Sequence, residues 1–203
     1  MLNIRLPFRE EVIAIIDIAP GSARAAFLSV GPTGARVHAQ TYSLISIETE
    51  TADHSITAIG ERVDDVCKRL LEAGAQKGIA GHIKSIYCFV HTPWAHSTTV
   101  RKRTDFETET RIQGTHMSAL AKAMLDEMKD LNRDALMEAA VIRTWLNGYP
   151  VVHPEGKTAH SLVVCAIVSE LDQTVKKNAE AAIHRSFPSS TIEWRSAAHA
   201  MQM

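Results

Sequence analysis

The chain has little of several residue types, and each scarcity argues against a class of protein. Only 5% of its 203 residues are aromatic, which argues against an aromatic platform for sugars or single-stranded nucleic acid. Basic residues number 22 and acidic residues 23, so no basic excess exists to attract nucleic acid. Three widely spaced cysteines, Cys67, Cys88 and Cys165, form no CxxC pair, and we interpret them as buried thiols in a reducing compartment.

Long hydrophobic runs are also missing from the sequence. No stretch reaches the roughly 18 apolar residues that a membrane span requires. Charged residues near the N-terminus occupy the place where a signal peptide needs an apolar core. We therefore expect a cytoplasmic protein without a transmembrane segment. With 45% hydrophobic and 22% charged residues, the chain is typical of a globular protein of one large or two small domains.

The spacing of apolar residues in the first half predicts three strands, a helix and a fourth strand. A run rich in β-branched residues ends at Pro20-Gly21, and turn-forming residues join the next two strands, so we expect an antiparallel meander. Apolar residues then fall at helical spacing, and strand character returns ahead of Pro93. The strands are expected at residues 12–18, 25–30, 35–47 and 83–90, and the helix at 55–74.

The second half predicts the order strand, helix, strand, strand, helix, strand. Asp172 is a suitable N-cap for the second of these helices, which Pro188 ends. The strands are expected at residues 97–106, 139–146, 161–169 and 191–194, and the first helix at 116–131. The whole chain is therefore expected to have an α/β fold.

The residues from Asp17 to Arg24 are the most informative segment for function. They place a carboxylate at the end of a buried strand, followed at once by a turn of small residues. The simpler interpretation is a β-hairpin turn with Asp17 bonded to the backbone, because short Gly-Ser turns are common. The other interpretation is a phosphate cradle, in which Gly21 and Ser22 offer backbone N–H groups and a hydroxyl to phosphate oxygens.

This segment resembles the first phosphate loop of the actin-like ATPase superfamily, in which a strand ending in Asp-x-Gly-(Ser/Thr) turns into a second strand. Residues 88–97, Cys-Phe-Val-His-Thr-Pro-Trp-Ala-His-Ser, resemble the end of the first strand set of FtsA-like and PilM-like proteins. The turn at residues 146–150, followed by Pro-Glu-Gly-Lys at 154–157, is similar to the small inserted subdomain of those proteins.

The resemblance implies a partial actin-like, or ribonuclease-H-like, lobe with a strand-helix-strand-strand inserted subdomain. The lobe would cover residues 1–93, the insertion 94–195 and a tail 196–203. It also implies a site for ATP and magnesium. Asp17 would orient a magnesium-bound water, and Gly21 and Ser22 would face the phosphates. Ala19 and Pro20 depart from the family pattern, and the proline removes one N–H donor.

The resemblance also sets the expected function. A second Asp-x-Gly loop does not occur in the sequence, so we expect one lobe that does not hydrolyse ATP efficiently by itself. The chain would be an FtsA/PilM-like scaffold that recruits or assembles a cell-division or type IV pilus complex. It would act through self-association or an assembly protein, and a partner could recruit it to the inner face of the membrane. Two alternatives stay open: an ATP-binding ATPase whose second lobe is absent from this chain, and a non-catalytic α/β interaction domain.

Other chemistry-bearing residues favour structural interpretations. His91 and His96 flank a proline, with no carboxylate or thiol at metal-ligand spacing, so we expect exposed loop residues. The basic residues 101–103 are followed at once by acidic ones and should be a solvated strand that also protects a sheet edge. Trp145 lies in an apolar strand and is expected inside. Methionines at helical spacing are expected in a core, namely Met117, Met124 and Met128.

Overall fold

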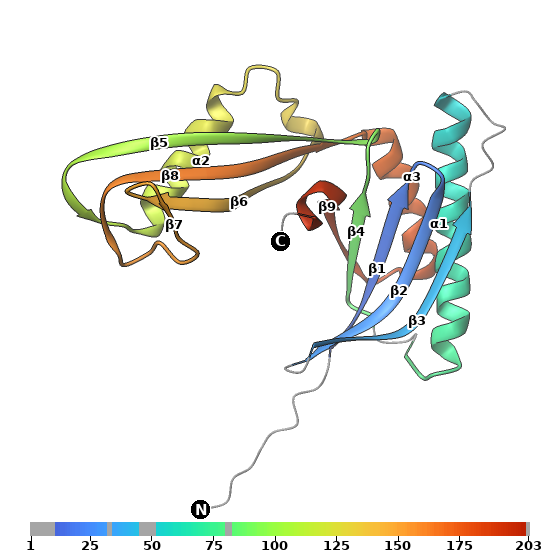
Figure 1. The fold of residues 1–203 in the computed structure, drawn as a ribbon. Helices are drawn as coiled ribbons and strands as arrows, with labels where there is room; N and C mark the ends of the chain where they lie inside the picture. Colours follow the sequence, from blue (N-terminus) through green and yellow to red (C-terminus); the bar gives the residue numbers. More distant parts are fainter. Residues whose placement is uncertain (1–10, 32–33, 45–51, 80–82, 202–203) are drawn as a thin grey trace, which may run out of the picture. The chain divides into compact units, whose positions relative to one another are not determined.

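The computed structural model describes residues 11–31, 34–44, 52–79 and 83–201, which fold into two units. The first unit takes in Met1–His91 and Gln173–Trp194, and the second takes in Thr92–Asp172 and Arg195–Met203. Each unit is built around its own β-sheet with helices on one face (Figure 1). The predicted α/β class is therefore confirmed.

The sheet of the first unit has five strands in the order β3-β2-β1-β4-β9. The first three strands form the predicted antiparallel meander, and β4 runs parallel to β1. These strands are β1 (Glu11–Ala19), β2 (Ser22–Gly31), β3 (Gly34–Leu44), β4 (Ser85–Val90) and β9 (Thr191–Ser196). The last three residues of the predicted third strand, 45–47, lie outside the described part of the chain.

Helices α1 (Ala52–Ala75) and α3 (Gln173–Ser186) cover one face of this sheet (Figure 1). Strand residues alternate between the two faces, so Ile16 and Phe27 are fully buried on the helix side. A fully buried side chain of this size contributes about 1.5–3 kcal/mol relative to an exposed one. Helix α1 has a buried apolar stripe on one side, formed by Ile59, Val63, Val66, Cys67 and Leu70.

All three cysteines are buried free thiols, as predicted. Burial, with a smaller contribution from Asp64, raises the pKa of Cys67 to about 12. Burial also raises the pKa of Cys88 well above its ordinary value. Because the thiolate is the reactive form, these two cysteines are structural rather than nucleophilic.

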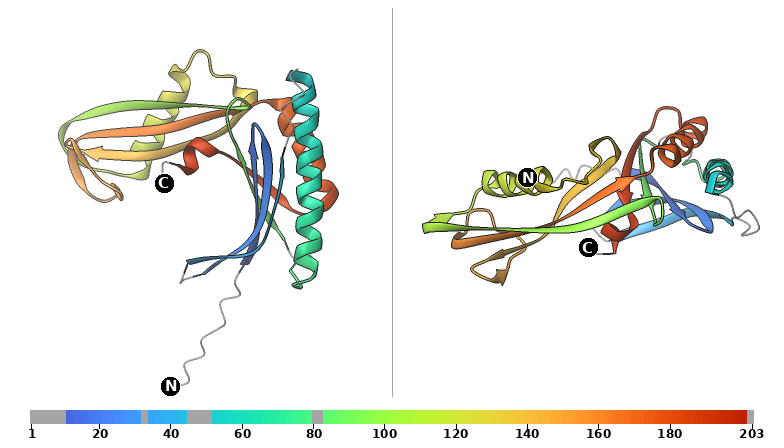
Figure 2. Two further views of the ribbon diagram at one scale, coloured as in Figure 1. Left: turned by 45° about the vertical axis from the view of Figure 1, so that its right-hand side comes forward. Right: turned by 90° about the horizontal axis from the view of Figure 1, so that it is seen from above.

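The sheet of the second unit has four strands in the order β5-β8-β6-β7. Helix α2 (Gly114–Glu127) packs on one face (Figure 2). Its Leu120 and Met124 belong to one buried hydrophobic cluster with Leu162 and Val164 of β8. The predicted core position of Met124 is thus confirmed, and Met117 packs partly buried against the same cluster. The other elements are β5 (Ala95–Arg111), β6 (Leu136–Leu146), β7 (Tyr149–Pro150), β8 (Thr158–Leu171), the short helix η1 (Arg133–Ala135) and α4 (Ala197–Ala200).

The structure divides the chain differently from the predicted 1–93, 94–195 and 196–203. The strand-helix-strand-strand order is found in β5, α2, β6 and β8, but α3 and most of β9 belong to the first unit. The described part of the expected tail forms α4 in the second unit. Periodicity reveals where a strand lies along the chain but not which sheet it joins, and this is why β9 was assigned to the wrong unit.

None of the helices in the described ranges is both long enough and apolar enough to cross a membrane.

Candidate functional site

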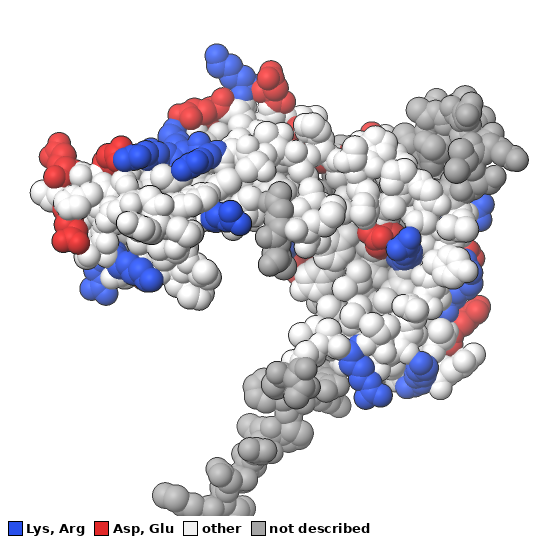
Figure 3. Space-filling model, in the orientation of Figure 1, with Lys and Arg blue, Asp and Glu red and all other residues white. Residues whose placement is uncertain are grey.

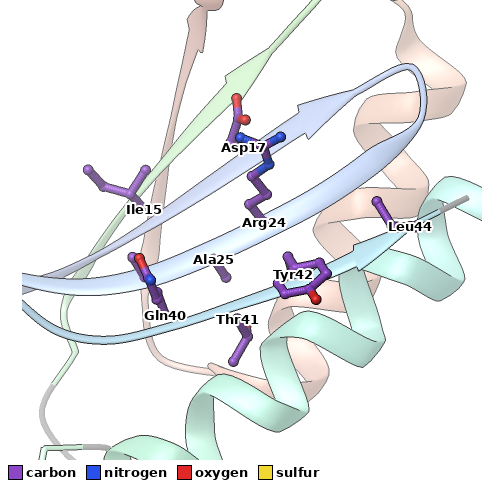
Figure 4. Close-up of a pocket in the computed structure, with 9 residues that line it drawn as sticks. Ile15, Asp17, Arg24, Ala25, Gln40, Thr41, Tyr42 and Leu44 are labelled. Atoms are coloured by element: carbon purple, nitrogen blue, oxygen red, sulfur yellow. The ribbon is translucent and has the colours of Figure 1, made fainter.

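Asp17 lies at the C-terminal end of β1, between side chains of two neighbouring strands. It pairs in register with Arg24 of β2 and with Phe89 of β4. Its Oδ1 is 2.8 Å from Nε2 of His91, the residue that follows β4. Figure 4 shows the Asp17 and Arg24 side chains pointing toward one another. The carboxylate therefore meets a histidine side chain, where the simpler sequence interpretation expected the backbone, and His91 is more than an exposed loop residue.

The turn after Asp17 is short and offers few hydrogen-bond donors. Ala19 pairs with Ser22, so only Pro20 and Gly21 form the turn, and the proline has no N–H. Gly21 is outside the left-handed region, and an added Cβ would meet no atom within 4 Å, so the backbone does not require a glycine there. Ser22 is only 8% exposed.

The phosphate cradle expected around Asp17 depends on the donors of this turn and on nearby metal ligands. No group of three or more His, Cys, Asp or Glu side chains that could hold a metal occurs in the part of the chain that the structure describes. The carboxylate is hydrogen-bonded within the protein. Binding of ATP and magnesium by Asp17, Gly21 and Ser22 therefore stays a prediction.

A hollow of about 650 Å³ adjoins Asp17 on the first sheet (Figure 4). Asp17 and Arg24 line it together with apolar and amide side chains from β1, β2 and β3. Tyr42 and Leu44 at its rim are each 65% exposed, although both are large apolar residues. The lining residues are Ile15, Asp17, Arg24, Ala25, Ala26, Gln40, Thr41, Tyr42 and Leu44. Such a surface suits contact with another apolar surface.

A cluster that the sequence analysis missed surrounds Glu138 on β6 of the second unit. Its Oε2 is 2.9 Å from Nδ1 of His199 on α4. Its Oε1 accepts hydrogen bonds from the Ser169 hydroxyl at 3.0 Å and from the Ser196 N–H at 2.9 Å. The Ser97 hydroxyl extends the network, 2.9 Å from that of Ser169. The only sequence signal is that Glu138 is the one carboxylate of β6.

Burial and hydrogen bonding act in opposite directions on Glu138. The side chain is only 4% exposed, and this burial raises the pKa of its carboxyl. Hydrogen bonds from Ser196, His199 and Ser169 outweigh burial and hold the pKa of Glu138 below its ordinary value. The carboxylate is thus charged and satisfied, and it fastens α4 to the second sheet.

The basic residues 101–103 have three different environments. The guanidinium of Arg103 donates to Asp105 at 2.6–3.0 Å, and Lys102 pairs with Glu127 of α2. Arg101 instead lies over the ring of Trp145, with its guanidinium carbon 4.9 Å from the ring centroid. The expectation that Trp145 packs inside was wrong. Its ring is half-buried, because the neighbouring Leu146 takes the core side of the strand.

Comparison with known proteins shows a similarity of fold only. No protein family model and no curated protein matches the chain. A solved structure of a PilM–PilN type IV pilus biogenesis complex is similar with a TM-score of 0.51 and 10% identity, over 89% of this chain and 45% of that chain. At this identity the similarity shows a shared fold and nothing further.

Two more solved structures are similar at lower scores. One is the cytoplasmic domain of EpsL, an inner membrane component of the type II secretion system of Vibrio cholerae, with a TM-score of 0.39 and 8% identity over 90% of this chain and 56% of that one. The other is a Bacteroides thetaiotaomicron protein of unknown function with an actin-like ATPase fold, with a TM-score of 0.33 and 6% identity over 95% and 54%.

This chain thus spans about half the length of each of these structures. Its mixed α/β fold with two sheets is consistent with a partial actin-like ATPase fold.

Proposed function

We propose that this chain is an FtsA/PilM-like scaffold that helps to recruit or assemble a type IV pilus or cell-division complex through protein–protein contacts. The observation that supports this proposal is the similarity, over 89% of the chain, to a structure of a PilM–PilN complex. In this proposal the scaffold works in the cytoplasm, and a partner brings it to the inner face of the membrane.

The open surface of the first sheet supports contact with proteins rather than with a small charged substrate. Apart from Asp17 and Arg24, its hollow is lined by uncharged and mostly apolar side chains, and Tyr42 and Leu44 leave most of their surface in water. Large exposed apolar side chains gathered in one place are typical of protein interaction sites. Either a second copy of the chain or an assembly protein could cover them.

Site-specific photo-crosslinking in the native cells tests the scaffold proposal. A photoreactive residue would replace Tyr42 beside the hollow or Tyr149 on β7, which is 75% exposed. Lys68, whose side chain is 63% exposed on α1, is the control position. We expect a second copy or a component of a membrane-anchored assembly to be captured from Tyr42 or Tyr149 and not from Lys68. Capture of nothing above the Lys68 level would overturn the proposal.

The alternative of an ATP-binding ATPase draws support from the position of Asp17, at the end of β1 beside a hollow. The hydrogen bond that this carboxylate accepts from His91 weighs against it, as does the scarcity of donors in the following turn. Titration with magnesium-ATP separates the two functions. Saturable binding that is lost in Asp17→Ala and kept in Asp65→Ala, a position on α1 whose side chain is 42% exposed, would favour the ATPase. We expect no saturable binding.

A further inference from the structure

Three strands of the second sheet bring two arginines and a tryptophan together on the face opposite α2. Cys165 of β8 pairs with Arg101 of β5 on one side and with Arg143 of β6 on the other. Trp145 lies two residues beyond Arg143 and therefore on the same face. The guanidinium carbons of Arg101 and Arg143 are 4.9 Å and 6.0 Å from the centroid of its ring. Two positive charges thus converge on one indole.

Neither of these arginines has a carboxylate partner among the residues that the structure describes. Their basic neighbours differ, since Arg103 is bonded to Asp105, and Lys102, on the α2 side, to Glu127. Like charges held side by side repel, and a carboxylate placed between them would relieve the repulsion. The planar guanidinium group matches a carboxylate with two parallel hydrogen bonds. The pair is therefore suited to an acidic ligand.

Strand β6, which carries Arg143 and Trp145, is open along most of one edge. Strand β7 pairs with β6 only at Trp145 and Leu146. Within the described ranges no strand pairs with residues 136–143 on that side. Unpaired N–H and C=O groups of an edge strand form a template for an added strand from another protein. An extended segment could therefore pair with β6.

A hollow of about 380 Å³ lies where β7 ends along this edge. Most of its wall is aliphatic, which suits an apolar side chain. It is lined by Val141, Ile142, Arg143, Thr144, Pro150, Val151 and Val152. Arg143 belongs to the wall of this hollow, so neighbouring side chains of an extended segment could place an apolar group in the hollow and a carboxylate beside Arg143.

We infer that β6 and the Arg101–Trp145–Arg143 cluster bind an extended segment of a partner protein in which acidic and apolar residues alternate. The biological role of this site rests on the proposed scaffold function, which it deepens by naming the chemistry of the partner. A nucleic acid fits less well, because β5 also carries Asp105, Glu107 and Glu109, and the chain has a net charge of -1. Basic and acidic side chains are interspersed over the second unit in Figure 3.

A peptide titration of the full chain tests this inference. The probe is a capped peptide of about nine residues that alternates Glu and Val, long enough to pair with a strand. Calorimetry would measure the affinity, and NMR would locate the site. We expect saturable binding, with shifts in the β6 amides and the Trp145 indole N–H. A peptide alternating Lys and Val should not bind, and an oligonucleotide should not displace the acidic peptide.

Paired variants locate the charge recognition. The double variant Arg101→Gln, Arg143→Gln should bind the acidic peptide roughly tenfold more weakly or worse, because two charge-assisted contacts are lost. Arg133→Gln is the control, since Arg133 is an exposed arginine of the same unit already paired with Asp126. The inference is overturned by any of three results: no saturable binding of the acidic peptide, equal binding of the Lys-Val peptide, or undiminished affinity in a folded double variant. The titrations of the wild type with the acidic peptide and with the Lys-Val peptide can overturn the inference even if the double variant does not fold.

The outcome can be separated from that of the scaffold proposal. Crosslinked capture of a partner without any binding of the acidic peptide would sink this inference and leave the scaffold proposal standing. Binding of the peptide at β6 without capture of any partner in cells would sink the scaffold proposal and leave the binding chemistry standing.

Discussion

The two units pack in a similar way but expose different surfaces. Each covers one face of its sheet with helices, but the hollow of the first unit is largely apolar, with Asp17 bonded to His91 at its rim. The corresponding face of the second unit carries Arg101 and Arg143 over Trp145. Two sheets of similar architecture can therefore expose chemically different surfaces.

The units also differ in how deeply each buries a carboxylate. Asp17 of the first unit keeps 29% of its side chain exposed, whereas Glu138 of the second keeps 4%. An exposed pair is screened by water and contributes little to stability. A buried carboxylate with three donors stabilises the structure only while every donor stays satisfied.

Phe27→Ala should have the largest effect. Phe27 is fully buried under the helices of the first unit and packs edge-to-face on Phe187, with ring centroids 6.1 Å apart. Removing the ring should lower the free energy of unfolding by about 3–5 kcal/mol, measured by urea denaturation. Tyr42→Ala, at a 65% exposed position of the same sheet, should cost about 0.5 kcal/mol or less. Equal losses would contradict the assignment of the helix side as the core.

Glu138→Ala should have the next largest effect. The substitution removes the acceptor for Ser169, Ser196 and His199 and leaves these donors without their partner in a buried place. We expect a loss of about 2 kcal/mol of unfolding free energy, measured by urea denaturation, and faster amide hydrogen exchange in α4. Glu127→Ala, on the exposed side of α2, is the control. Unchanged exchange in α4 would show that Glu138 does not fasten this helix.

The sequence predicted the elements better than their partners. Periodicity predicts a strand at 12–18 and a helix at 55–74, close to β1 at Glu11–Ala19 and α1 at Ala52–Ala75. This works because the spacing of apolar residues along the chain follows the period of the strand or the helix. It could not place β9 beside β4, because strand pairing is decided by contacts between distant segments.

Prediction of the candidate sites from the sequence is limited in the same way, because their residues lie far apart along the chain. Asp17 stood out at the end of its strand, but its partner His91 is 74 positions away and is brought close by the parallel pairing of β1 with β4. Glu138 and His199 are 61 positions apart, and no local pattern joins them. Arg101 looked like one part of a basic run, although it and Lys102 point to opposite faces of the strand.

The pH dependence of stability should show a smaller effect, which comes from Glu138. Hydrogen bonds hold the pKa of Glu138 below its ordinary value in the folded chain. Such a group stabilises the fold at pH values above its unfolded pKa, and this stabilisation is lost as the pH falls through the folded pKa. The stability advantage of the wild type over Glu138→Gln should therefore be full near pH 7 and shrink below about pH 4. An advantage that stays constant from neutral to acid pH would contradict this linkage.

Asp17→Asn should have the smallest effect on stability. Asp17 and His91 keep 29% and 35% of their side chains exposed. Water therefore screens the interaction between them in the folded chain as well as in the unfolded chain. We expect a loss below about 1 kcal/mol by urea denaturation, close to that of Asp65→Asn on α1, where the side chain is 42% exposed. A loss as large as that of Glu138→Ala would mean that the hydrogen bond to His91 holds β1 and β4 together. The pair would then be structural, and less available to any ligand of the first unit. A small loss leaves the carboxylate free to exchange His91 for a partner's side chain, as an interaction surface requires.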